Sequence, residues 1–513
     1  KLEELRNEKE KSTHDTYSLF LKGSKLPQSL IKPLTQQGKI VQKHSTFDET
    51  FGKNSRRTKP TLKVYTMEEL ADSTDKMNEE YNLTNDSNLK YLNEEEKDAL
   101  LKFSHPKSSI AASLIGGLDY RGGEAIRDTI FPAADGGVYL RGFIDSLEFM
   151  LDARIYVESH SAERPSSFDG EFVEFQKEED NSGVEYASYA RYRGHLALNM
   201  CFGRLDFGRD VMHWGPGYYN NLTLNQFALP FNSLTFELQV GPLSVISFYG
   251  DLRIYKNSMS IKNKDQRHLY GHRYELDLGN LTLGMSEIQA VYDNNNAWLF
   301  VPIVPLFMEK GNFSERSNNG ALSFDANYRF LEMFRLYTEF FLDDMESPIS
   351  LIRNDNAEAK WAFLGGLQFG KDFQIGKHFL EVGTLAEYAR VEPYVYTHFI
   401  ENTAQLAHLG KPLGNQGGPN SQTIDWLVYG RLNKHWNVGL RQTWFWKGTD
   451  YGSALNDTTP NNHMKYPKSF LEGAKMQYSI TPSLAYEGQY TFFALEWTFI
   501  DDRKFYTRLG FKW

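Results

Sequence analysis

From about Ile110 onwards, apolar and polar side chains alternate along the chain with a period of two, which is typical of β-strands that have two different faces. The last residues show this most clearly: one face carries Phe505, Thr507, Leu509, Phe511 and Trp513, and the other carries Lys504, Tyr506, Arg508, Gly510 and Lys512. On the edge of a soluble sandwich such an aromatic stripe would promote aggregation, whereas it suits a strand between lipid and water. The pattern therefore predicts an all-β transmembrane barrel.

Similar runs recur about eighteen times, each long enough to cross a bilayer when the strand is tilted. The predicted strands span residues 110–120, 137–144, 147–157, 186–200, 204–211, 233–240, 243–254, 270–278, 281–291, 320–330, 333–342, 360–370, 377–390, 421–432, 435–446, 468–479, 487–499 and 503–513. A count of about eighteen predicts a closed antiparallel barrel with both ends of the barrel domain on the same side of the membrane.

The connections between these runs alternate strictly between short turns and long polar loops. Two-residue turns such as Gly241-Pro242 and Gly279-Asn280 are followed by loops near 158–185, 212–232, 255–269, 292–319, 343–359, 391–420 and 447–467. Short periplasmic turns and long extracellular loops are the pattern of outer-membrane barrels of the Gram-negative type. We therefore expect these long loops to lie outside the cell.

Residues 1–105 follow a different pattern, with helical periodicity and capping signals. Thr66 with Glu69 precedes one apolar run, and Asn93 with Glu96 precedes Leu100, Leu101 and Phe103 as a second predicted helix. The segment is too polar to build a large core of its own. We expect residues 1–105 to form a mostly helical periplasmic or lumenal segment that could also bind protein partners, and residues 106–513 to form the barrel.

Composition narrows the remaining classes. The chain has 513 residues, a net charge of −10 and 14% aromatic residues, and its mean hydropathy is −0.52. No apolar run approaches the roughly 20 residues of a spanning helix, so a helical membrane protein is excluded. The mild acidity argues against nucleic-acid binding, and we find no phosphate-binding loop or paired zinc ligands. Because Lys1 opens directly onto charged sequence, we expect a mature chain from which the signal peptide has been removed.

One stretch, Gly208 to Asn232, interrupts the alternation with the turn Trp214-Gly215-Pro216-Gly217, followed by tyrosines and asparagines. Proline fixes one φ angle and glycine reaches positive φ, so this backbone can fold tightly. Together with Gly208-Arg209 before it, and with Asn221-Leu222-Thr223-Leu224-Asn225 and Ala228-Leu229-Pro230 after it, the turn resembles the signature of the Wzi-type capsule assembly proteins.

That resemblance implies a fold and a function. Members of the family are outer-membrane barrels of eighteen strands with a helical bundle at the periplasmic end and outer loops that close the pore. They act as surface lectins that hold capsular polysaccharide on the cell. The resemblance covers a local motif together with the architecture and length of the chain, so it implies a distant relative.

A lectin needs flat aromatic faces for sugar rings and fixed polar groups for their hydroxyls, and this loop offers both. The other interpretation is that Trp214 plugs the barrel mouth and the Gly-Pro-Gly turn folds the loop inward. The sequence leaves both open. The predicted polysaccharide ligands are Arg209, His213, Trp214, Gly215, Pro216, Gly217, Tyr218, Tyr219, Asn221 and Asn225.

Two charged stretches are further candidates. The segment 255–273 carries Lys256, Lys262, Lys264, Arg267, His268, His272 and Arg273, which could attract acidic polymers or lipopolysaccharide phosphates. The acidic cluster Asp169, Glu171, Glu174, Glu178, Glu179 and Asp180 lacks the ligand spacing of a calcium loop. A solvated loop without a ligand is the favoured interpretation of both stretches.

No nucleophile elbow or metal-spaced histidines occur, so we expect no enzymatic activity, no cofactor and no metal. The sequence thus predicts a non-enzymatic outer-membrane protein that binds surface polysaccharide for capsule assembly or attachment, in contact with membrane lipid and lipopolysaccharide. Two alternatives remain: a diffusion porin, since a barrel of this width can hold an aqueous lumen, or a structural subunit of a larger secretion or adhesion complex.

Overall fold

The structure is a computed structural model. It describes residues 100–512 except 106–107, 124–130, 145, 160–174, 180–184, 201–202, 241, 254–266, 279, 293–295, 307–317, 332, 345–359, 377, 399–403, 434–435, 458–468, 488–490 and 501–503. The helices predicted before residue 100, with the capping pairs at Thr66 and Asn93, lie outside the described residues.

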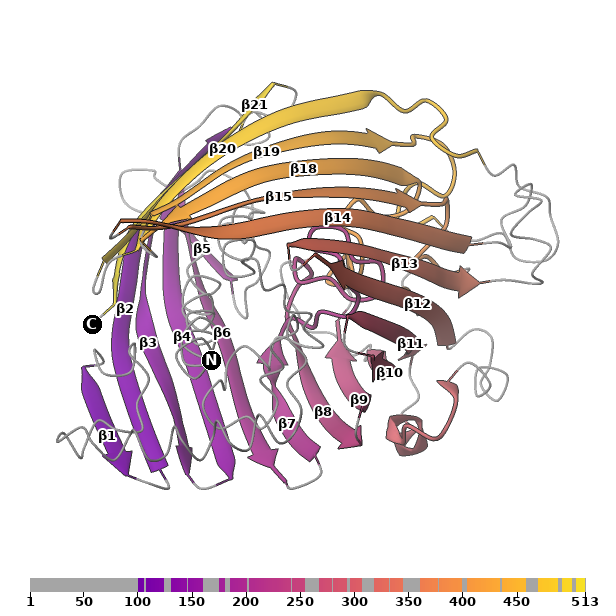
Figure 1. Ribbon diagram of the computed structural model, residues 1–513, viewed down its shortest axis with the longest axis horizontal. Coiled ribbons are helices and arrows are strands. Elements are labelled where there is room, and N and C mark those ends of the chain that lie inside the picture. Colours follow the sequence, from indigo (N-terminus) through magenta and orange to yellow (C-terminus); the bar gives the residue numbers. More distant parts are fainter. Residues whose placement is uncertain are drawn as a thin grey trace.

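The fold is a closed antiparallel barrel of 18 strands (Figure 1). Each strand pairs with its neighbours along the chain, and the last strand pairs with the first, from Ile115 opposite Lys512 to Gly123 opposite Lys504. In barrel order the strands are β2 (Ser108–Gly123), β3 (Phe131–Ile144), β4 (Leu147–Ser159), β6 (Glu185–Asn199), β7 (Gly203–Asp210), β8 (Phe231–Val240), β9 (Leu243–Leu252), β10 (Arg267–Asp277), β11 (Leu281–Tyr292), β12 (Asn318–Phe330), β13 (Phe334–Asp344), β14 (Lys360–Ile375), β15 (His378–Val391), β18 (Ser421–Leu432), β19 (Trp436–Lys447), β20 (Met476–Glu487), β21 (Thr491–Ile500) and β22 (Lys504–Lys512).

Two short strands join the edges of this ring, and a separate pair, β16 (Ala407–His408) and β17 (Lys411–Pro412), is not part of it. β5 (Phe175–Glu179) pairs with the first residues of β6, and β1 (Leu101–His105) pairs with the first residues of β2. The helix predicted through Leu101 and Phe103 is therefore wrong in these residues, which are exposed strand residues at the end of the predicted N-terminal segment. Pairing along the free edge of β2 overrides their local helical pattern.

One strand was predicted in the wrong place. The strand expected at 468–479 is found at Met476–Glu487 as β20. Leu471 and Gly473 adopt positive φ angles of 58° and 68°, which a strand cannot contain, so residues 470–473 form a turn. Pro482 lies inside β20, and the pairing of β20 with β21 is interrupted at this residue, because proline has no N–H to donate.

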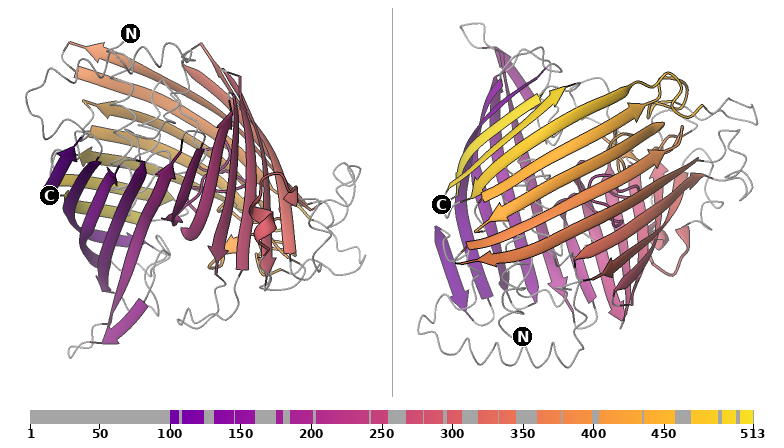
Figure 2. Two further views of the ribbon diagram at one scale, coloured as in Figure 1. Left: turned by 90° about the horizontal axis from the view of Figure 1, so that it is seen from below. Right: turned by 45° about the horizontal axis from the view of Figure 1, so that its top comes forward.

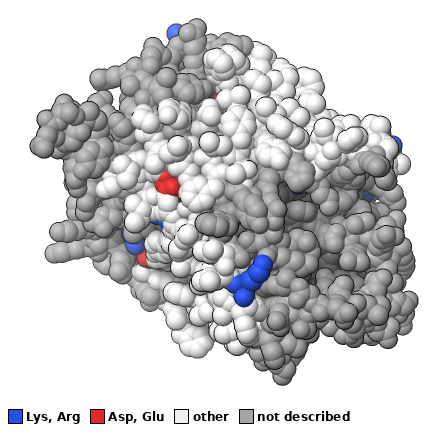
Figure 3. All heavy atoms as spheres, turned by 90° about the vertical axis from the view of Figure 1, so that its left-hand side faces the viewer, with Lys and Arg blue, Asp and Glu red and all other residues white. Residues whose placement is uncertain are grey.

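The two faces of the wall differ as the alternation predicts. On β21 and β22, Trp497, Leu509 and Phe511 are exposed on the outside, whereas Phe492 and Ala494 are buried on the inside. Figure 3 shows one side of the barrel, where the described residues are almost all uncharged. Within the described part of the chain, no helix has the length and apolar character needed to cross a membrane.

Candidate functional site

The loop between β7 and β8 lies inside the barrel. Trp214 is 0% exposed, and all ten residues predicted to bind polysaccharide are buried. Figures 1 and 2 show the loop enclosed by the barrel wall, behind β12 and β13 in the first view. The role of these ten residues in ligand binding stays a prediction. In this conformation none of the ten offers a free face to a polymer outside the barrel.

The turn Trp214-Gly215-Pro216-Gly217 gives the loop its inward fold. The Trp214 N–H donates to the Leu224 carbonyl at 3.0 Å, which closes the loop into a narrow hairpin. Gly215 has a φ of +111°, and a Cβ there would lie 2.7 Å from Glu339 Oε2. Only glycine fits this conformation and this space. The hairpin tip can therefore approach the side chains of the opposite wall.

A buried carboxylate on β15 holds the middle of this loop. Glu387 accepts hydrogen bonds from the main-chain N–H groups of Tyr218, of Tyr219 at 2.8 Å and of Asn220 at 3.2 Å. The Tyr337 hydroxyl on β13 donates to the same carboxylate at 2.6 Å. Charge-assisted hydrogen bonds are the strong ones in proteins. One wall residue thus satisfies three consecutive loop donors.

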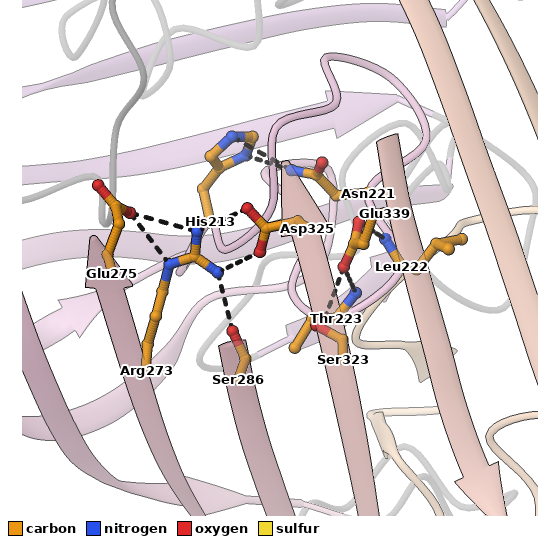
Figure 4. A network of polar contacts seen from close by, with 10 residues as sticks. All are labelled: His213, Asn221, Leu222, Thr223, Arg273, Glu275, Ser286, Ser323, Asp325 and Glu339. Atoms are coloured by element: carbon orange, nitrogen blue, oxygen red, sulfur yellow. Dashed lines mark hydrogen bonds and ion pairs between the residues drawn. The ribbon is translucent and has the colours of Figure 1, made fainter. Parts of the chain in front are cut away.

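A second carboxylate, on β13, holds the next residues in the same way (Figure 4). Glu339 accepts from the N–H groups of Leu222 and Thr223, each at 2.9 Å, and from the Thr223 hydroxyl at 2.6 Å. The Thr223 hydroxyl also lies 2.7 Å from Ser323 Oγ on β12. Beside this contact, His213 lies 3.0 Å from the Asn221 side-chain amide nitrogen. The loop is therefore fixed to neighbouring strands of the wall.

A third carboxylate connects the loop to β18 and β19. Asp425 accepts from the Asn220 side-chain amide at 2.8 Å and from the Arg441 guanidinium at 2.7 Å. The same guanidinium carbon lies 3.9 Å from the centre of the Tyr219 ring, a cation–π contact. Asn225 closes the loop internally, because its amide donates to the Tyr219 carbonyl at 2.8 Å. Arg209, at the end of β7, lies 5.3 Å from the centre of the Tyr192 ring.

The loop between β15 and β18 completes the plug. The Tyr396 hydroxyl donates to the Leu222 carbonyl at 2.7 Å, and the Asn225 N–H donates to the Leu413 carbonyl at 2.8 Å. Trp214 meets Phe248 of β9 edge-on at 5.0 Å between ring centres. These loops and the inner wall share one apolar core, which contains Met212, Trp214, Leu222, Leu224, Phe231, Ile246, Phe248, Leu252, Leu269, Ile288, Phe341, Leu364, Val391, Val395, Tyr396, Leu406 and Leu413. We call these two loops, 211–230 and the described part of 392–420, the lumen plug.

Burial decides the protonation of the titratable groups in the plug. It raises the pKa of the Tyr219 and Tyr396 hydroxyls above their usual value, so both stay neutral. His408 lies in β16 (Ala407–His408), which pairs with β17 (Lys411–Pro412). Burial, followed by the positive charges of Arg209, Arg267 and Arg253, lowers the pKa of His408 well below its usual value. Its neutral Nδ1 accepts the Arg253 N–H at 3.0 Å.

The described residues of the basic stretch 255–273 point in different directions. Arg267 donates to the carbonyls of Arg253, Gln405 and Ala407, at 2.9 to 3.2 Å, and so anchors the plug. Arg273 pairs inside the barrel with Asp325 at 2.7 Å, whereas His268 and His272 alternate with these arginines along β10 and face outwards. Lys256, Lys262 and Lys264 lie outside the described residues, as do Asp169, Glu171, Glu174 and Asp180. Among the described residues, no group of three or more potential ligands could hold a metal ion.

Sequence reasoning missed that three wall carboxylates, Glu339, Glu387 and Asp425, hold the loop. Each occupies an inward position of an alternating strand, where a polar residue is unremarkable in a barrel. The only available signal was that an acidic side chain on the inner wall needs a partner when the lumen is filled. Which loop supplies that partner depends on contacts between residues more than a hundred positions apart.

Comparisons with known proteins identify the fold. The family described as NGP1NT (NUC091) domain matches residues 1–81, which lie outside the described residues and cover too little of the chain to assign it to a family. No curated protein matches the chain. Among solved structures, OccAB1 of Acinetobacter baumannii is similar with a TM-score of 0.41 and 11% identity, over 80% of this chain and 97% of OccAB1. OccK8 (OprE) of Pseudomonas aeruginosa has a TM-score of 0.41 and 9% identity, over 79% and 97%.

A further solved structure is more similar. It is Wzi, described as an outer membrane protein involved in group 1 capsule assembly in Escherichia coli and as a carbohydrate binding β-barrel. The TM-score is 0.51 and the identity is 15%, over 78% of this chain and 84% of Wzi. At this identity the likeness shows the fold alone: the chain has the fold of an outer-membrane β-barrel.

Proposed function

We propose that this protein is a non-enzymatic outer-membrane protein that binds surface polysaccharide, for capsule assembly or attachment. The observation that carries the proposal is the lumen plug, in which Glu339 of β13, Glu387 of β15 and Asp425 of β18 fix the loop that follows β7 inside the barrel. A lumen filled by an apolar core suits a protein that presents a surface better than one that conducts solutes. The description of Wzi as a carbohydrate binding barrel involved in capsule assembly supports the same proposal.

The plug gives the predicted ligand residues a second possible role within this function. With Trp214 buried, the loop can hold the outer loops in a fixed arrangement, and the polymer then contacts side chains above it. Tyr451, in the loop after β19, is 64% exposed and offers an aromatic face of the kind that sugar rings stack on. Direct contact between the polymer and Trp214 would instead require the loop to open.

The test is glycan binding by the purified full-length protein, with the organism's own surface polymers, alongside planar-bilayer conductance. We expect the protein to bind the polymer and the planar bilayer to show no channel openings. No binding, together with an unchanged capsule after deletion of the gene, would refute the proposal, and large steady openings would favour the diffusion porin. Trp214→Ala separates the two roles of the loop: loss of binding in an intact barrel indicates sugar contact or presentation, whereas raised conductance with unchanged binding indicates plugging alone.

A further inference from the structure

A segment of the loop after β11 lies on the outside of the barrel. Residues 296–306 include the short 3₁₀ helix η4 (Ala297–Phe300) and run beside the outer faces of β9, β10 and β11. Figures 1 and 2 show the coil of η4 outside the wall, next to these strands. We call residues 296–306 the outer strap.

The sequence of the outer strap is unusual for a loop expected in water. From Ala297 to Met308, the chain contains no charged side chain, and the indole N–H of Trp298 is the only side-chain hydrogen-bonding group. The most exposed side chains of the strap are also apolar: Trp298 is 73% exposed and Ile303 is 85% exposed. An exposed apolar stretch of this kind marks an interaction or membrane surface.

The wall beneath the outer strap is polar where a lipid-facing wall should be apolar. Ser247, His272 and Glu287 stand opposite one another on β9, β10 and β11, on the outer face, and all three are buried. The next row on the same outer face, towards the long-loop end, holds Tyr249, Tyr270 and Gln289. Towards the short-turn end, the wall becomes apolar again with the row Leu243, Leu276 and Leu283. The polar rows thus coincide with the part of the wall that the outer strap covers.

These wall residues supply hydrogen bonds to the main chain of the outer strap. The Ser247 hydroxyl donates to the Phe300 carbonyl, the Tyr274 hydroxyl donates to the Pro302 carbonyl, and the Asn296 N–H donates to the Tyr270 hydroxyl at 3.2 Å. Irregular backbone is tolerated at membrane depth only where protein satisfies its polar groups. Leu299 and Leu306 pack against Tyr270 and Val291, which turns the remaining apolar side chains outwards.

We propose that the outer strap is embedded in membrane lipid, with Trp298 and Ile303 in contact with acyl chains. The strap replaces the wall of β9 to β11 as the lipid-facing surface, and it continues the exposed apolar belt of Leu243, Leu283 and Phe324. Tryptophan is enriched at the membrane interface, which suits Trp298. The inference rests on the outer-membrane location in the proposed function, but not on polysaccharide binding.

The test uses single-cysteine variants labelled with an environment-sensitive fluorophore in phospholipid vesicles. Cys201 is the only cysteine, so each variant is made with Cys201→Ser. Ile303→Cys is compared with Phe207→Cys, 62% exposed on the outer face of β7, and with Tyr451→Cys in the loop after β19. Quenching is measured with brominated acyl chains and with aqueous iodide. We expect the label at position 303 to behave like the label at position 207. Both should show blue-shifted emission, loss of intensity with bromolipid and little loss of intensity with iodide.

The controls separate the possible failures. If position 207 is quenched by bromolipid but position 303 is quenched by iodide, as at position 451, the strap proposal is wrong while the membrane location stands. If position 303 is protected from both quenchers, protein covers the strap, and the proposal is also wrong. If position 207 itself is reached by iodide alone, the barrel is not in lipid, and the proposed location fails together with the strap.

Discussion

Arg335, the second residue of β13, donates a hydrogen bond from its guanidinium to the main-chain carbonyl of Pro216. β13 begins at a short turn, whereas the loop that contains Pro216 starts from the wall at the opposite end of the barrel, after β7. Since Thr223 is held by Glu339, further along the same strand, the loop runs beside β13 towards the short-turn end. The plug therefore extends deep into the lumen and is more than a cover over its mouth.

Removing the carboxylate of Glu387 should release the plug. In Glu387→Ala, the N–H groups of Tyr218, Tyr219 and Asn220 lose their acceptor inside the protein, at a cost of about 1–3 kcal/mol for each buried donor left unsatisfied. We expect a lower free energy of unfolding in urea and raised planar-bilayer conductance. Glu472→Ala, at an exposed position in the loop before β20, is the control and should change neither. A silent bilayer with unchanged unfolding would contradict this role for Glu387.

The hairpin should not tolerate a side chain at position 215, next to its closing pair Trp214 and Leu224. Gly215→Ala places a Cβ 2.7 Å from Glu339 Oε2 at a φ of +111°, so strain of about 1–3 kcal/mol is expected. The matched control is Gly136→Ala on β3, where a Cβ meets nothing within 4 Å. Thermal unfolding of both variants checks the prediction. Equal melting temperatures for the two would show that the hairpin is not held against Glu339 as described.

Acidification should loosen the plug through His408. Its folded pKa is depressed by burial and by neighbouring arginines, so the unfolded chain binds the proton more readily than the folded one. The stability contributed by neutral His408 is fully present above its usual pKa of 6.5 and falls by about 1.4 kcal/mol per pH unit as the pH drops below it, down to the folded pKa.

Urea unfolding between pH 7.5 and pH 5 measures this slope. His408→Asn is the control variant, since its side-chain oxygen can accept the Arg253 N–H and does not titrate. We expect the wild type to lose stability more steeply than the variant. Parallel pH profiles would exclude His408 as the cause.

Loss of a single hydroxyl should loosen the outer strap. Tyr274→Phe leaves the Pro302 carbonyl without its donor, which costs about 1–3 kcal/mol in an apolar setting. A label at position 303 should then become more accessible to iodide, with a lower melting temperature. Tyr328→Phe, on the exposed outer face of β12, removes a hydroxyl of the same kind away from the strap and serves as the control. The same change in both variants would rule out a specific contact.

The barrel could be predicted from the sequence because its signal is local. Alternation within β22, from Lys504 to Lys512, reflects only that lipid lies on one side and protein on the other. Where local geometry departs from that rule the prediction failed, as at Pro482 inside β20 and at Leu101, whose place depends on the free edge of β2.

The plug and the strap could not be predicted in the same way. The sequence favoured an unusual backbone at Gly215, and the left-handed φ angle confirms it. The partner of that loop, Glu387, lies 168 positions from Tyr219, and no local pattern encodes such a contact. The apolar run after Ala297 has neither the period of a strand nor the length of a spanning helix, so its place on the outer wall follows only from the polar rows beneath it.

β1 and β22 share one edge of β2, since β3 occupies the other edge from Ser108 to Arg121. β1 pairs as far as Ala112, and β22 begins to pair at Ile115. If the last strand slid along the seam towards β1 by more than about two residues, Lys512 would collide with Leu101, and a slip of a single residue would turn its lipid-facing side chains inwards. The short first strand thus limits how far the last strand can slide along β2 in that direction.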